Sequence, residues 1–261
     1  MTELFIDIET IPAQRPDVFA EISASKSAKL AVDIAAIKVP GNYKNPELID
    51  KWNAEERPKQ IAALNAGVLS EVDDAYRKTS FDGAYGQICV IGFAVDDRPA
   101  QSYHVDDLSA VEERQLLEHF ACSLADCIAS NEVFSTVVIG HNVAAFDLRF
   151  LVQRHIIHNM RPHAVIGRAA QAKPWETDRV YDTMVQWSGL GKSVSLDKLC
   201  KALSVPTPKD GIDGSMVWDF VNDGRIEEVA AYCRKDVEAT RAVHRRMTYQ
   251  VEAVSFEDVA S

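Results

Sequence analysis

Apolar and polar positions divide the 261-residue chain into a short first strand, a long polar stretch, and a second half in which apolar runs alternate with helical patterns. Residues 4–9 are mostly apolar and predict the first strand, which Pro12 limits. Residues 14–86 are typical of helices and loops broken by prolines. One helix is expected over 46–59 and another directly after it.

The second half begins with a near-continuous apolar run at 87–95, which predicts a strand buried on both faces. Residues 101–105 would pair with it as a hairpin. Ser109 and Glu112 form a capping box at the start of a long amphipathic helix. Further strands are expected at 136–140 and 179–182, and further helices at 144–158, 195–203 and 226–251. This order predicts a mixed α/β sheet covered by helices.

Composition indicates a globular chain, with 47% apolar and 26% charged residues. No stretch approaches the roughly 18 apolar residues of a membrane span, and no basic leader precedes the first strand. The five cysteines are odd in number and include no C-x-x-C, which favours reduced thiols over disulfides or zinc. We therefore expect a cytoplasmic protein with no membrane association. Residues 1–261 should form a single domain, with 14–86 as a helical insertion inside it.

The net charge of −11 constrains the partners of the protein. A protein that grips duplex DNA along its length usually carries a basic surface, which this composition argues against. Bound cations can still supply positive charge locally in an acidic protein. The charge therefore disfavours long-range capture of nucleic acid and leaves chemistry on nucleic acid open.

Two carboxylates stand in the first strand. Asp7 and Glu9 are two residues apart, so both side chains leave the same face of the strand. Carboxylates in an otherwise apolar strand are costly unless cations or hydrogen-bonding partners accompany them. A solvated strand end would explain an isolated pair equally well.

Two later motifs also carry acidic residues. Asp147 follows the buried strand at 136–140 and lies near the first turn of a helix, where capping alone could account for it. Tyr232 and Asp236 are four residues apart on a late helix and share one face. A half-buried tyrosine beside a solvated aspartate explains that pair when it is judged alone.

In this order, the three motifs resemble those of the DEDD exonucleases of the tyrosine subtype, which include the proofreading domain of family B DNA polymerases. The segment FIDIET at 5–10 is similar to their first motif, 142–147 matches N-x3-F-D, and 232–236 matches Y-x3-D. The segments 86–93, 139–151 and 232–240 also resemble blocks of polymerase-B-like exonucleases. The resemblance covers the chain except for 14–86, which is longer than the usual connection, and the last dozen residues.

The resemblance implies a ribonuclease H-like fold, with a mixed five-stranded sheet flanked by helices, and a metal-dependent 3′–5′ exonuclease. It implies two divalent cations, Mg²⁺ or Mn²⁺, with Asp7 bridging both and Tyr232 orienting the attacking water. The remaining metal ligands would be Glu9, Asp147 and Asp236. Hard oxygen ligands favour Mg²⁺ or Mn²⁺ over zinc, and two such ions can activate water and stabilise the leaving oxygen.

Four further residues are candidate substrate contacts by the same resemblance. Thr10 and Ile11 would wedge against the 3′-terminal nucleotide, and Asn142 and Phe146 would contact its sugar or base. Loop or core packing explains each of them as well.

Three residues near these motifs have simpler structural interpretations. We expect Asp182 to cap a strand end, His141 to be a satisfied loop histidine, and Cys233 to be a small buried filler.

The expected substrate is a 3′ end of nucleic acid, with single-stranded DNA favoured and nucleoside monophosphates released. DNA repair is the expected setting, and a separate protein partner would deliver the substrate. Two alternatives stay open: a non-catalytic nucleic-acid or protein-binding module on the same fold, and a ribonuclease H-type endonuclease. The Y-x3-D motif favours the exonuclease.

Overall fold

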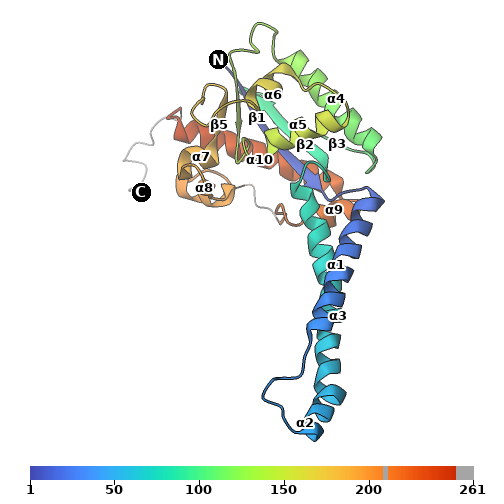
Figure 1. Cartoon of the computed structure of the whole chain (residues 1–261). Coiled ribbons are helices and arrows are strands. Elements are labelled where there is room, and N and C mark those ends of the chain that lie inside the picture. Colours follow the sequence, from blue (N-terminus) through green and yellow to red (C-terminus); the bar gives the residue numbers. More distant parts are fainter. Residues whose placement is uncertain (208–210, 251–261) are drawn as a thin grey trace. The chain divides into compact units, whose positions relative to one another are not determined.

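The computed structural model describes residues 1–207 and 211–250. The chain divides into two compact units, whose elements are labelled in Figure 1. The sheet unit consists of Met1–Ile11 and Gln87–Ser261, and the helical hairpin consists of Pro12–Gly86. The chain thus leaves the sheet unit directly after the first strand and returns at the second.

The helical hairpin is built from two long arms that pack on each other. Its elements are α1 (Pro16–Ala36), α2 (Pro46–Lys51), the π-helix η1 (Trp52–Glu56), α3 (Arg57–Arg77) and the 3₁₀-helix η2 (Lys78–Phe81). Few of its side chains are buried; Val18, Trp52 and Val72 are among them. The hairpin therefore has only a thin apolar core.

Pro58 does not end the helix predicted over 46–59, because helical structure continues without a break to Arg77. Proline has no N–H, and its ring crowds the carbonyl four residues earlier. The π-helical turn immediately before it holds more residues per turn than an α-helix, with the Arg57 N–H donating to the Trp52 carbonyl five residues back. This local widening of the helix lies where the proline would otherwise crowd the preceding turn.

The sheet unit contains a mixed five-stranded sheet, as predicted. Its strands are β1 (Thr2–Ile11), β2 (Gln87–Val95), β3 (Gln101–His104), β4 (Thr136–Gly140) and β5 (Val180–Asp182), in the spatial order β3-β2-β1-β4-β5. β2 is antiparallel to both β1 and β3, whereas β4 runs parallel to β1 and β5 runs parallel to β4. The order and directions are those of the ribonuclease H-like fold. The carboxyl ends of β1, β4 and β5 consequently lie at the same edge of the sheet.

The helices of the sheet unit are partly those predicted. They are α4 (Ala110–Cys127), α5 (Asp147–Ile157), α6 (Ala164–Ala169), α7 (Thr183–Ser188), α8 (Leu196–Leu203), α9 (Val217–Asn222) and α10 (Ile226–Met247). α5 begins three residues later than expected, and the predicted helix end at 251 lies outside the described residues. The six-residue helices α6, α7 and α9 were not predicted, because so short a segment contains too few turns to show a helical period. In the described part of the chain, no helix is long and apolar enough to cross a membrane.

The two faces of β1 pack on different helices. Leu4, Ile6 and Ile8 belong to the main core, together with residues of α4, α5 and α6. Phe5 points the other way and packs with Val237 of α10. Because side chains alternate along a strand, Asp7 and Glu9 leave β1 on the Phe5 side, toward α10.

A buried ionic cluster joins α4, α5 and β2. Glu113, only 1% exposed, accepts hydrogen bonds from Arg154 and from the Ile88 backbone N–H, and pairs with His158. A buried carboxylate is tolerated where its hydrogen bonds are made in this way. The cluster fixes the start of β2 opposite the end of β1.

Candidate active site

Asp7 and Glu9 sit on the part of β1 that faces α10. Glu9 is 8% exposed and Asp7 is half-buried. The register between β1 and β2 shifts between Glu9 and Thr10, which leaves Cys89 as an extra residue on β2. Such bulges re-aim strand side chains and are frequent beside active sites.

α10 approaches the sheet most closely opposite Asp7. The β2 residue paired with Asp7 is Gly92, and a Cβ built there would lie 2.7 Å from Cys233 Sγ. That thiol is 3.4 Å from Asp7 Oδ2 and donates toward it. The absence of a side chain at Gly92 therefore allows α10 to bring its own functional residues to β1.

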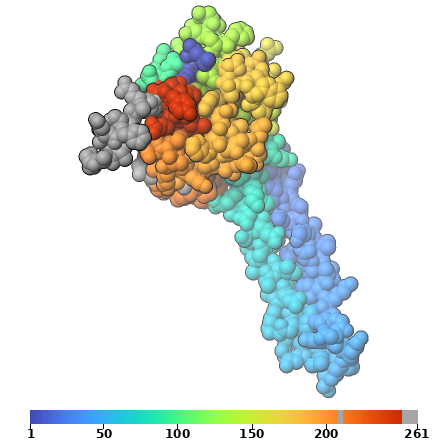
Figure 2. Space-filling view, turned by 90° about the vertical axis from the view of Figure 1, so that its left-hand side faces the viewer, coloured from blue at the N-terminus to red at the C-terminus, as the bar shows by residue number. Residues whose placement is uncertain are grey.

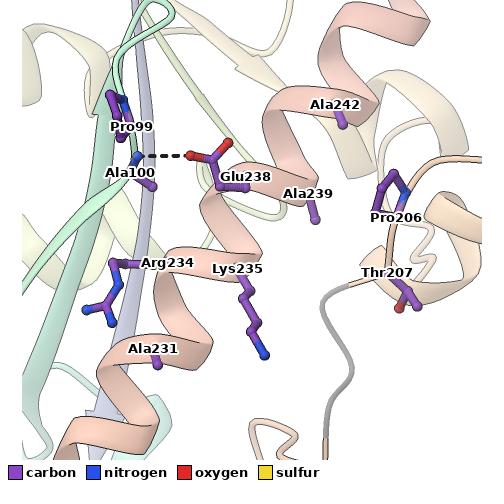
Figure 3. Close-up of a pocket in the computed structure, with 10 residues that line it drawn as sticks. All are labelled: Pro99, Ala100, Pro206, Thr207, Ala231, Arg234, Lys235, Glu238, Ala239 and Ala242. Atoms are coloured by element: carbon purple, nitrogen blue, oxygen red, sulfur yellow. Dashed lines mark hydrogen bonds between the residues drawn. The ribbon is translucent and has the colours of Figure 1, made fainter.

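Contacts on the outer side of α10 hold it against the turn between β2 and β3. Glu238 accepts a hydrogen bond of 2.9 Å from the Ala100 N–H (Figure 3). Arg241 donates to the carbonyls of Asp96 and Arg98. These bonds fix the rotation of the helix about its axis and so orient the face that carries Tyr232.

Tyr232 and Asp236 lie one turn apart on the inner face of α10, as the spacing predicts. Asp236 is 8% exposed, and its carboxyl group lies beside the Tyr232 side chain. Its Oδ1 atom is buried and has no hydrogen-bond partner among the described residues. Burial, followed by the charge of Asp236, raises the pKa of Tyr232 strongly, so that Tyr232 is a neutral phenol at all ordinary pH values.

Asp147 reaches the same place from the first turn of α5. The pairing of β1 with β4 ends at Phe5 and Ile139. Farther along β1, the Ile8 N–H donates to Asp147 Oδ1 at 3.0 Å. The Asp147 carboxylate therefore accepts a backbone N–H that β4 leaves unpaired. This hydrogen bond holds Asp147 near Asp7 and Glu9, and we call these three residues and Asp236 the acidic cluster.

Asp182 shapes the loop that leads to Asp147. Its Oδ1 accepts from the Asn142 N–H and its Oδ2 from the Ala144 N–H. It also caps α7 through the N–H groups of Met184 and Val185. The prediction of a strand-end cap is confirmed, and the same carboxylate also orders the turn before α5.

The four carboxyl groups repel one another in a desolvated space. Burial raises the pKa of Asp7 and of Glu9 well above the usual range, and the neighbouring carboxylates raise both further. Burial raises the pKa of Asp147 to about 7 and that of Asp236 to about 6. Within residues 1–207 and 211–250, no lysine or arginine forms an ion pair with any of the four.

This donor set fits divalent cations. Asp236 Oδ1 is a buried acceptor that lacks a donor, and the carboxylate oxygens of Asp7 and Glu9 lie within 4.8 Å of each other and of Cys233 Sγ. Hard carboxylate oxygens are the ligands that Mg²⁺ and Mn²⁺ prefer. Asp7, Glu9, Asp147 and Asp236 are therefore the residues that could hold such ions.

The candidate substrate contacts differ in their surroundings. Thr10, Asn142 and Phe146 are partly exposed, and Asn142 has a positive φ of 65°. Ile11 is 1% exposed and belongs to the main core. Its side chain offers no surface to a substrate, so core packing accounts for it.

His141 and Cys233 have the surroundings expected of them, and Cys233 makes one contact that was not expected. His141 is satisfied by Thr183 Oγ1 and the Val194 carbonyl. Cys233 is a buried filler, but it also touches Asp7. No local pattern pointed to this contact, although a glycine opposite a carboxylate on a buried strand is a signal of close helix approach.

Comparison with known proteins agrees with this geometry. Residues 81–260, well over half of the chain, match a family model described as "Predicted 3'-5' exonuclease related to the exonuclease domain of PolB". The chain belongs to this family. The matched range of this PolB-related exonuclease family includes Asp147, Tyr232 and Asp236. Asp7 and Glu9 lie outside it, and the fold brings them to the others.

A solved structure supports the fold. The family B DNA polymerase from the hyperthermophilic archaeon Pyrobaculum calidifontis superimposes with a TM-score of 0.50 at 16% identity, over 64% of this chain and 22% of the polymerase. The matched part of the chain thus corresponds to about a fifth of that polymerase, and at this identity the likeness concerns the fold. A search of the curated proteins found no match.

The close approach at Gly92 can be tested by Gly92→Ala. The added Cβ would displace Cys233 and with it α10, so we expect a loss of roughly 1–3 kcal/mol in the free energy of unfolding. Mn²⁺ affinity, measured by calorimetry, should fall roughly tenfold or more as Asp236 moves. Gly67→Ala, in open space on α3, is the matched control. Unchanged Mn²⁺ affinity in Gly92→Ala would contradict the packing argument.

Burial of the carboxylate cluster, together with the repulsion inside it, should make the metal-free protein less stable as pH rises. Since the pKa values of Asp147 and Asp236, about 7 and about 6, exceed the ordinary 3.8, the folded state binds more protons than the unfolded state between about pH 4 and 7. Their contribution to stability is present at acidic pH and is lost as pH rises through these values.

The measurement is urea unfolding in EDTA at pH 5 and pH 8, for the wild type and for Asp147→Asn/Asp236→Asn. The buried histidines, whose pKa values are lowered by burial, oppose the trend but cancel in the comparison. We expect the stability of the variant relative to the wild type to rise by roughly 4 kcal/mol between pH 5 and pH 8. An equal difference at both pH values would show that the cluster is not strained.

Proposed function

We propose that this protein is a metal-dependent 3′–5′ exonuclease that removes nucleoside monophosphates from the 3′ end of single-stranded DNA. The observation that carries the proposal is the convergence of four carboxyl groups from β1, α5 and α10, none of which pairs with a lysine or arginine among the described residues. Membership of the PolB-related exonuclease family supports the same reaction class. The electrostatic surroundings of these groups support a role for metal ions.

Each residue of the cluster has a defined task in the proposed reaction. Asp7, Glu9, Asp147 and Asp236 would hold two divalent cations, Mg²⁺ or Mn²⁺, which when bound supply water activation and stabilisation of the leaving oxygen. The Ile8 N–H keeps the Asp147 carboxylate oriented.

Tyr232 contributes geometry rather than proton transfer. Its raised pKa keeps the hydroxyl protonated, so it is unsuited to act as a general base. Its position one turn before Asp236 on α10 places the ring beside the carboxyl groups. From there the phenol can orient the attacking water for in-line displacement.

The partly exposed residues around the cluster would receive the terminal nucleotide. Thr10 follows Glu9 directly, and Asn142 and Phe146 flank the turn before Asp147. The net charge of −11 favours short, single-stranded ends over a long duplex. We also propose that a protein partner presents such ends and that the process is DNA repair in the cytoplasm.

Two alternatives are less well supported. A non-catalytic binding module would have no reason to bury four mutually repelling carboxylates, which cost stability in the absence of metal. A ribonuclease H-type endonuclease would share the acids of β1, but it would not require a phenol one turn from a carboxylate on a late helix. The pair of Tyr232 and Asp236 therefore favours the exonuclease.

The reaction can be tested with single strands of DNA and RNA labelled at either end. We expect a ladder of products shortened from the 3′ end in Mg²⁺ or Mn²⁺, and no cleavage in EDTA. Asp7→Ala should lower the rate on the order of a thousandfold, as removal of a charge-stabilising group does. The exposed Glu118 of α4, paired with Arg114, provides the control Glu118→Ala. Cleavage in EDTA, internal cleavage or no turnover would each refute the proposal.

Tyr232→Phe separates water positioning from metal binding. Loss of the hydroxyl should slow cleavage roughly 10- to 100-fold, the scale for a misplaced reacting group, with little change in Mn²⁺ affinity. The rate in single-turnover experiments and the affinity by calorimetry give the two quantities. Parallel losses of rate and affinity would assign Tyr232 to the metal site instead.

A further inference from the structure

A hollow of about 450 Å³ lies beside the turn that leads into α5. Its walls include Ala144 and Ala145 of that turn, Arg149 of α5, Lys173, and the buried Asp182. Figure 2 looks onto the side of the sheet unit where the segments between α6 and α8 are exposed, in yellow to orange. No residue of the acidic cluster lines the hollow, so it is separate from the carboxylates.

Two exposed tryptophans belong to the segments that line this hollow. Trp175 is 72% exposed and Trp187 is 49% exposed, each adjacent in sequence to a lining residue. Leu190, which lines the hollow, is 68% exposed. The other two tryptophans of the chain differ, since Trp52 is buried and Trp218 packs partly against the core. Large apolar side chains left in water at one place mark a binding surface.

Two cations accompany these tryptophans. The Lys173 ammonium group lies 5.4 Å from the centre of the Trp175 ring, and Arg149 is exposed on α5. Within the described ranges 1–207 and 211–250, neither forms an ion pair with a carboxylate. Glu176, the nearest acid in sequence to Trp175, pairs with Arg179. Unpaired cations at one apolar hollow of a protein with a net charge of −11 select an anionic ligand.

The hollow is close to the carboxylate cluster along the fold. Ala145 and Arg149, two of its lining residues, are each two residues from Asp147. Asp182 lines the hollow and also holds the turn before Asp147 through the Asn142 and Ala144 N–H groups. A nucleic-acid strand that leaves the acidic cluster would therefore need to pass only the start of α5 to reach the hollow.

We propose that this face, formed by Arg149, Lys173, Trp175, Trp187 and Leu190, binds the single strand that leads away from the cleaved 3′ end, a proposal that rests on the exonuclease function. Bases stack on Trp175 and Trp187, and backbone phosphates meet Arg149 and Lys173. Flat aromatic side chains combined with basic ones are how proteins hold single strands without reading their sequence. An acidic peptide would satisfy the cations but would leave the indole faces without flat partners.

Strand binding is tested without cleavage, in EDTA, by fluorescence anisotropy of a 5′-labelled 12-nucleotide deoxythymidine strand. We expect Trp175→Ala/Trp187→Ala to bind at least about tenfold more weakly than the wild type. Trp175→Phe/Trp187→Phe keeps the rings and should bind within a few-fold of the wild type. The matched control is Phe134→Ala, which removes an aromatic side chain that is 81% exposed, precedes the amino end of β4 and does not line the hollow.

The cations are tested by the salt dependence of the same binding. Arg149→Gln/Lys173→Gln should lower the slope of log affinity against log salt by about 1.4, since each phosphate contact on a single strand contributes about 0.7. Wild-type affinity and slope in the tryptophan and cation variants would overturn the proposal. Equal competition by an oligoglutamate of the same charge would also overturn it, because stacking would then contribute nothing.

A second assay separates this proposal from the exonuclease function. The nitrophenyl ester of thymidine 5′-monophosphate, hydrolysed in Mn²⁺, reports the carboxylate cluster without a strand. A wild type that hydrolyses the ester but binds the strand independently of Trp175 and Trp187 refutes the strand-binding face alone. A wild type that binds the strand through the tryptophans but hydrolyses neither ester nor strand refutes the exonuclease and leaves the face supported.

Discussion

The structure depends on a repulsion. Asp7, Glu9, Asp147 and Asp236 are brought together in a largely desolvated space, and their pKa values are raised as a result. Among the described residues no lysine or arginine pairs with them, and the bonds from the Ile8 N–H and the Cys233 thiol offset the cost only in part. An arrangement of this kind survives only if the surrounding packing is strong enough to impose it. The fold can therefore be understood as a scaffold that holds an unfavourable cluster in place.

Different contacts hold each element of the scaffold in place. Gly92 lets α10 come close to β1, and hydrogen bonds to the turn between β2 and β3 set the rotation of that helix. The Ile8 N–H and the turn organised by Asp182 set the position of Asp147. Apolar packing on the opposite face of β1 holds the strand itself. The cost of the acidic cluster is thus offset by contacts that lie outside it.

The two sides of the Asn142–Asp147 turn have opposite electrostatic character. On one side the carboxylates select cations, and on the other Arg149 and Lys173 stand unpaired beside exposed tryptophans. An acidic protein can act on an anionic polymer only if attraction is local, and this division supplies local attraction at two neighbouring places. Asp182 is common to both, since it lines the hollow and holds the turn that ends at Asp147.

Local spacing in the sequence determined much of this picture, and long-range packing decided the rest. The two-residue period of a strand put Asp7 and Glu9 on one face, and the four-residue spacing on a helix paired Tyr232 with Asp236. The order of apolar runs predicted the mixed sheet. By contrast, other features depend on residues up to 226 positions apart. These are the burial of Ile11, the contact of Cys233 with Asp7, and the bond from the Ile8 N–H to Asp147. No local period encodes such contacts, because only the packing of α5 and α10 against β1 sets their distances.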